Sequence, residues 1–234
     1  MAESILWELT KLPRHMGGTK GVAFYVFGVV LLGVLAPWYL GFDFADVPVL
    51  VIYACLSLLL VPPVVAESVA GESERALRPA EAARVREWLL AKVGAGALYG
   101  WISTVFILAL AIASLRMALG RFLPPPALLA AGLALISLAV SFFAAAVAAA
   151  VAMGARSPKH AKRDLRQGLL LLLVFLIFFC RLSGAWKRRL ALPTTGAGFV
   201  EFAVVISIGL TGASVGLLRL ALTRSEPEEI HLNI

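Results

Sequence analysis

The sequence predicts an all-α, multi-pass membrane protein with six transmembrane helices. The chain has 234 residues, of which 61% are hydrophobic and only 15% are charged, a composition outside the range of soluble domains. Its apolar residues come in runs of about twenty, the length that one helix needs to cross the hydrocarbon core of a bilayer. They do not alternate with polar residues, as they would in the strands of a membrane barrel. Because every backbone polar group must be paired inside hydrocarbon, we expect these runs to form helices.

The first segment, residues 1–20, is expected to form an amphipathic helix on the cytoplasmic side. Ser4 is placed to cap this helix, and Trp7 lies beside an apolar stripe at helical spacing that consists of Ile5, Leu6, Leu9 and Leu12. Such a helix can lie in the membrane interface. The alternative, a short helix packed on the rest of the bundle, stays open. Gly17 and Gly18 end the helix in either case.

The rest of the chain divides into a six-helix transmembrane domain, residues 21–223, and a cytoplasmic tail, residues 224–234. Taking about twenty residues for each crossing, we expect spans at Gly21–Leu40, Val47–Val65, Val93–Leu115, Ala127–Met153, Gly168–Arg181 and Gly198–Leu218. The fifth span, with the sequence "GLLLLLVFLIFFC", is short for a hydrocarbon core of about 30 Å. We therefore expect a short or partly broken helix there.

The distribution of lysine and arginine predicts the orientation. Most of the 21 basic residues lie near the termini and in the loops at 66–92 and 154–167. The positive-inside rule then places both termini and both loops in the cytoplasm, in a chain of the cell's inner membrane. The net charge of +7 is explained by this topology and by attraction to anionic lipid headgroups, so we expect no nucleic-acid partner.

The residues that catalytic or cofactor chemistry would need are not found inside the spans. His15, His160 and His231 all lie in cytoplasmic segments, which excludes haem ligation within the bundle. Cys55 and Cys180 lie inside predicted spans, where a thiol packs as a small apolar group. No phosphate-binding loop is present, so we predict no catalytic, cofactor or metal site on this chain.

Small residues recur at spacings that allow helices to approach closely. Gly96 and Gly100 are four residues apart, Ala145 and Ala149 repeat the spacing, and a third set consists of Gly209, Gly212 and Gly216. Two interpretations stay open, packing within the chain and packing between subunits.

The most densely charged stretch, "AESVAGESERALRPAEAARVREWLLAKVGAG", lies between the second and third spans. Pro79 is suited to the first turn of a new helix. In that helix an aromatic residue, Trp88, lies among Glu81, Arg84, Arg86 and Glu87. Because buried tryptophan and arginine often anchor interfaces, the pattern indicates a docking element for a soluble partner. A solvated loop helix is the alternative.

This layout resembles the membrane subunits of type-2 ABC transporters, which have an amphipathic helix before six spans and a coupling helix between the second and third. The family's second loop is matched here at Glu72, Glu74, Arg75, Pro79, Glu87 and Lys92, although its Gly-Thr-Leu-Glu element is missing. The resemblance implies ATPase-coupling residues at Glu72, Glu74, Arg75, Glu81, Arg84, Arg86, Glu87 and Trp88. It also implies a short re-entrant element between the fifth and sixth spans, in "LSGAWKRRLALPTTGAG".

By this resemblance the chain is expected to be the permease subunit of an ATP-driven exporter and not itself an enzyme. Its partners would be two copies of an ABC ATPase, which would hold ATP and Mg, and a second permease subunit, identical or homologous. The spans lack buried charge, which favours an amphiphilic or hydrophobic substrate moved outward. Two other classes stay open: a secondary carrier or channel subunit without an ATPase, and a membrane assembly subunit that transports nothing.

Overall fold

The computed structural model describes residues 2–15, 18–35, 51, 53–76, 82–119, 127–154, 160, 163, 165 and 196–223. Within these ranges the chain is helical and contains no strand. The helices are α1 (Ala2–His15), α2 (Gly18–Val30) with its π-helical continuation η1 (Leu31–Leu35), α5 (Ser57–Ala76), α6 (Ala82–Leu119), α7 (Ala127–Gly154) and α9 (Gly196–Thr223).

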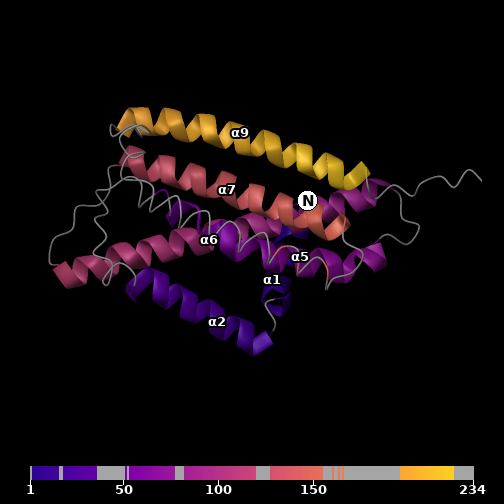
Figure 1. The fold of residues 1–234 in the computed structure, drawn as a ribbon, viewed down its shortest axis with the longest axis horizontal. Helices are drawn as coiled ribbons and strands as arrows, with labels where there is room; N and C mark the ends of the chain where they lie inside the picture. The colour runs from indigo at the N-terminus through magenta and orange to yellow at the C-terminus, as the bar shows by residue number, and fades with distance from the viewer. Residues whose placement is uncertain are drawn as a thin grey trace, which may run out of the picture.

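The long helices lie side by side in layers. In Figure 1, α9 covers α7, α7 covers α5 and α6, and α2 lies on the opposite side of the bundle, while α1 crosses the others steeply. The starts of α2 and α6 and the ends of α5, α7 and α9 lie at the same end of the bundle as α1. We call this the polar end, because the exposed charged residues of α6 lie there.

Three of the described helices are long and apolar enough to cross a membrane: α6 over Arg84–Ser114, α7 over its whole length, and α9 over Ala197–Thr223. A shorter apolar helix covers Tyr25–Leu35. The all-α class and the presence of several membrane-crossing helices are thus supported. The predicted fifth span at Gly168–Arg181, the tail at 224–234 and nearly all of the predicted re-entrant element lie outside the described residues.

One boundary differs from the sequence prediction. The charged loop helix and the third span, expected to meet near Val93, form the single 38-residue helix α6. No proline interrupts this stretch, and Leu89, Leu90 and Ala91 are good helix formers. Lys92 does not need to reach water at the boundary, because its charge is paired inside the bundle.

Small side chains allow α5, α6 and α7 to pack closely in the centre of the bundle. A Cβ atom at Gly96 would overlap Val65 of α5, and one at Gly100 would overlap Val61. Ala145 of α7 is fully buried beside Gly96. The first two sets of small residues therefore pack within the chain. At the third set, on α9, an added Cβ atom would meet nothing within 4 Å in the described part of the structure.

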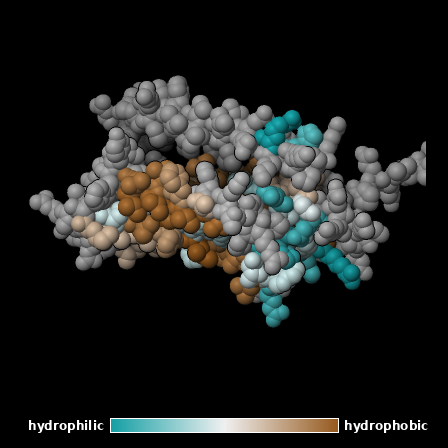
Figure 2. All heavy atoms as spheres, turned by 90° about the horizontal axis from the view of Figure 1, so that it is seen from below, coloured by the Kyte–Doolittle hydropathy of each residue, from teal (hydrophilic) through white to brown (hydrophobic). Residues whose placement is uncertain are grey.

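The surface separates into apolar and polar parts. Figure 2 shows apolar residues gathered along one part of the visible face and polar residues towards one end. Large apolar side chains are exposed on several helices, among them Phe27 on α2, Phe106 on α6, and Val205 and Ile208 on α9. An apolar exterior on long apolar helices is what a lipid environment requires.

Candidate functional site

A buried lysine joins three helices at the polar end. Lys92, in α6, is only 2% exposed, and its ammonium nitrogen lies 2.6 Å from Glu8 Oε2 of α1 and 2.8 Å from Glu72 Oε2 of α5. It also donates a hydrogen bond of 2.8 Å to Ser68 Oγ of α5. The approach to Glu8 does not have the angle of a hydrogen bond, so that contact is an ion pair. We call Glu8, Lys11, Ser68, Glu72 and Lys92 the Lys92 junction.

The junction balances its charges. Lys11 lies 3.4 Å from Glu8 and 4.0 Å from Glu72, so two ammonium groups face two carboxylates. A buried charge without a partner is expensive, and several partners with a hydrogen bond offset its desolvation. Lys92 can therefore lie inside the bundle, where a lone lysine could not remain charged.

Glu72 is the member of the junction with a shifted pKa. Burial raises the pKa of its carboxyl, but the hydrogen bond and charge of Lys92, the charge of Lys11 and a hydrogen bond from Trp88 together lower it more. The net pKa is lower than the ordinary value of 4.5, so Glu72 is ionised at neutral pH. The ion pair with Lys92 is thus complete under physiological conditions.

Apolar contacts hold α1 in the same place. Ile5 and Leu9 pack against Val64 of α5 and against Ala95 and Tyr99 of α6. These residues form one face of the predicted apolar stripe, so the helix packs on the bundle. Its other face is open to the surroundings.

Two tryptophans border a hollow beside the junction. Trp7 of α1 is 61% exposed and carries Lys11 over its ring, with the ammonium nitrogen 3.1 Å from the ring centroid. The hollow has a volume of about 450 Å³ and is lined by Ser4, Trp7, Glu8, Arg84, Glu87, Trp88 and Ala91. It therefore lies between α1 and the first turns of α6, and it offers aromatic surface together with charges of both signs.

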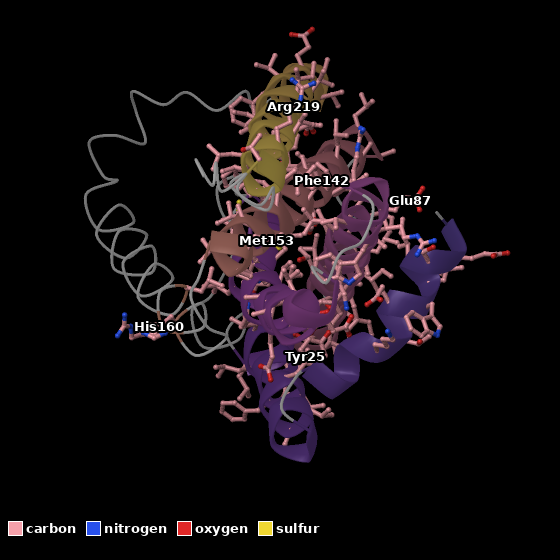
Figure 3. All side chains as sticks on the ribbon, turned by 90° about the vertical axis from the view of Figure 1, so that its right-hand side faces the viewer. Tyr25, Glu87, Phe142, Met153, His160 and Arg219 are labelled. Atoms are coloured by element: carbon pink, nitrogen blue, oxygen red, sulfur yellow. The ribbon has the colours of Figure 1, made fainter. Side chains whose placement is uncertain are left out.

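The structure brings part of the predicted coupling set to this place. Glu72 is in the junction, Trp88 is half-buried beside it, and three charged residues of α6 are exposed around them, namely Arg84, Arg86 and Glu87. Figure 3 looks at the polar end and shows Glu87 next to α1, with Arg219 far from it on α9. Glu74 and Arg75 lie in the last turn of α5, but their side chains are outside the described part, as is all of Glu81.

Sequence reasoning misses the partners that hold the site together. Glu8 lies in a segment whose main sequence feature is its apolar stripe, and Ser68 has no sequence signal of its own. Lys92 matches a position of the family's second loop, but the pattern does not identify it as a site residue. A lysine at the boundary of an apolar run is a signal that an acidic partner is needed, and this signal could have pointed to Glu8 and Glu72.

The arrangement has structural rather than chemical capability. No group of three histidine, cysteine, aspartate or glutamate side chains able to hold a metal ion occurs among the described residues. The junction ties the N-terminal helix to the two helices that flank the charged loop. A displacement of any one of them at this end is therefore resisted by the other two.

Comparisons with known proteins leave the family open. A scan against protein-family models and searches of curated proteins and of solved structures find no match.

Proposed function

We propose that this chain is the permease subunit of an ATP-driven ABC exporter that moves an amphiphilic or hydrophobic substrate outward. A separately encoded ATPase would dock at the polar end and supply the energy. A second permease subunit, identical or homologous, would complete the transport unit. The proposal begins from the resemblance of the layout to type-2 ABC permeases, and the observation that carries it is the Lys92 junction.

The junction suits a docking surface because it makes that surface rigid. The exposed residues Arg84, Arg86 and Glu87 lie within about two turns of Lys92 on the same helix. Lys92 in turn is fixed by Glu8 and Glu72. A force on the exposed turns would pass into three helices together, as coupling to an ATPase requires.

Charge reversal at the exposed turns tests the proposal. We expect Arg84→Glu with Arg86→Glu to leave membrane insertion and the melting temperature nearly unchanged, because surface substitutions cost about 0.5 kcal/mol or less. Copurification with the ABC ATPase encoded beside this chain should be lost, since the partner surface would then meet the wrong charges. Arg219→Glu is the matched control: Arg219 is exposed on α9 and also lies towards the polar end.

Three outcomes would count against the proposal. One is unchanged association of the double variant with the ATPase, which would leave the charged turns merely solvated. Another is transport by the purified chain in vesicles without any ATPase, which would favour a carrier or channel. The third is ATP hydrolysis by the chain alone.

A further inference from the structure

The contacts of two glycines set the register of the three central helices. Gly96 of α6 faces Val65 of α5 and Ala145 of α7, and Gly100 faces Val61 and Ser141. Each step of four residues along α6 is therefore matched by a step of four along α5 and along α7. One further step from Gly100 reaches Thr104, from Val61 it reaches Ser57, and from Ser141 it reaches Ser137.

The helices still touch at this next level. Trp101 Nε1 of α6 donates a hydrogen bond of 3.2 Å to the carbonyl oxygen of Ala134 in α7. Leu58 of α5 and Leu108 of α6 both pack against the cluster that contains Ile136. Three hydroxyl side chains from three helices thus come to one level of the bundle.

These three hydroxyls are buried and unpaired. Ser57 is 0% exposed, Thr104 1% and Ser137 2%, and no hydrogen-bond partner exists for their oxygens in the described part of the structure. Other buried hydroxyls of the chain are satisfied: Ser141 and Ser214 each bond a carbonyl oxygen of their own helix at 2.7 Å. A buried hydroxyl without a partner costs free energy, so three at one level call for a ligand.

Backbone acceptors lie next to the same level. Pro62 and Pro63 are inside α5 and cannot donate to the carbonyl oxygens of Leu58 and Leu59, four residues earlier. The preceding turn is also irregular, because the amides of Leu58 and Leu59 bond the carbonyls of Cys55 and Leu56, three residues back. In apolar surroundings such carbonyls are commonly satisfied by hydroxyl side chains or ordered water.

We propose that Ser57, Thr104 and Ser137 form a binding site for water at the meeting point of α5, α6 and α7. Water is the ligand that fits because hydroxyls both donate and accept, and a buried water needs about two to four polar partners. A cation fits less well, since the set contains no carboxylate and a net charge among apolar helices is costly. The water would also supply donors for the carbonyls that the prolines leave in α5. This inference does not depend on the transport proposal.

Stability measurements in lipid nanodiscs test the site. We expect Ser57→Ala, Thr104→Val and Ser137→Ala each to raise the equilibrium constant for unfolding about tenfold, because each leaves the shared water with one partner fewer. The effects should not multiply. The variant with Thr104→Val and Ser137→Ala should fall short of the product of the single effects by about threefold or more.

Ser214→Ala is the matched control, because Ser214 is a buried serine whose hydroxyl bonds a carbonyl of its own helix. Its effect should multiply with that of Thr104→Val. If the triad pairs multiply in the same way, the three hydroxyls act separately and the shared site is rejected.

A direct measurement on the unmodified chain completes the test. In solid-state NMR of proteoliposomes, we expect magnetisation to pass from water to the Thr104 methyl group, and this transfer should weaken in Ser137→Ala. Absence of transfer in the unmodified chain would overturn the proposal. Stabilisation by sodium chloride but not by choline chloride at equal concentration would also overturn it, by assigning the site to a cation.

Discussion

Lys92 depends on its acidic partners more than they depend on it. Its ammonium group is almost fully enclosed, with Glu8 also buried and Glu72 29% exposed. Removing one member of a buried ion pair costs about 3–5 kcal/mol, because the remaining charge has lost its partner. We therefore expect Lys92→Met to lower the free energy of unfolding by about that amount.

The control for this prediction is Lys11→Met. The side chain of Lys11 is 22% exposed, so its loss should cost about 0–1 kcal/mol. Both variants can be compared by denaturant titration in nanodiscs. The double variant with Glu8→Gln and Lys92→Met should recover part of the loss, and equal losses for Lys92→Met and Lys11→Met would show that the junction contributes no more than a surface pair.

Acidity should weaken the same junction through Glu72. Its pKa in the folded chain is lower than the ordinary value of 4.5, so the folded state gains stability from the ionised carboxylate above that pH. This contribution is lost as the pH falls through the lowered pKa. We expect the melting temperature to drop below about pH 4.5, and to drop less steeply in Glu72→Gln. An identical acid profile for both proteins would assign the acid sensitivity to other carboxylates.

Residue-level prediction from the sequence reaches the exposed charges but not their anchor. Arg84, Arg86 and Glu87 can be placed on one helix because local spacing determines which residues share a helix. The pairing of Glu8 with Lys92 joins segments that are distant in the sequence. Such a pairing follows from how α1 lies against the bundle, which no local pattern encodes.

At the scale of the helix, the closest packing occurs at Gly96 and Gly100 of α6. A methyl group at Gly100 would meet Val61 and would lie 3.1 Å from Ser141 Oγ. We expect Gly100→Ala to destabilise the bundle by about 1–3 kcal/mol through overpacking. Gly212→Ala on α9 is the control, because a Cβ there meets nothing within 4 Å in the described residues, and a helical alanine should be neutral or stabilising.

Denaturation curves of the two alanine variants would decide this prediction. A stable Gly100→Ala protein would mean that the three central helices can separate without loss. A destabilised Gly212→Ala protein would indicate that the outer face of α9 is covered in the membrane.

Helix existence is easier to predict than helix boundaries. The sequence predicts α7 and α9 within a few residues of their observed ends, because uninterrupted apolar runs leave the backbone no alternative in hydrocarbon. The boundary expected near Val93 does not exist, since a single long helix satisfies every backbone group across the change from charged to apolar sequence. Pro62 and Pro63 are expected to weaken the end of the second span, yet α5 continues to Ala76.

For the whole molecule, the outer face of α9 should contact lipid. Val205 and Ile208 are each 68% exposed, whereas Ala203 on the same helix is fully buried. With the native cysteines replaced, nitroxide labels at positions 205 and 208 should be relaxed strongly by oxygen and weakly by a nickel chelate. A label at position 203 should respond weakly to both. Low oxygen response at 205 and 208 in native membranes would instead reveal a covering protein surface.

The unbroken course of α6 has a mechanical consequence. Its 38 residues span about 57 Å, close to twice the thickness of a hydrocarbon core. The close contacts at Gly96 and Gly100 hold this rod near its middle and act as a fulcrum, with arms of roughly 24 Å and 32 Å on either side. A lateral push on the exposed turns around Arg86 would tilt the rod and move its far end by a similar distance in the opposite direction. Motion would thus cross the membrane through a lever rather than through a hinge.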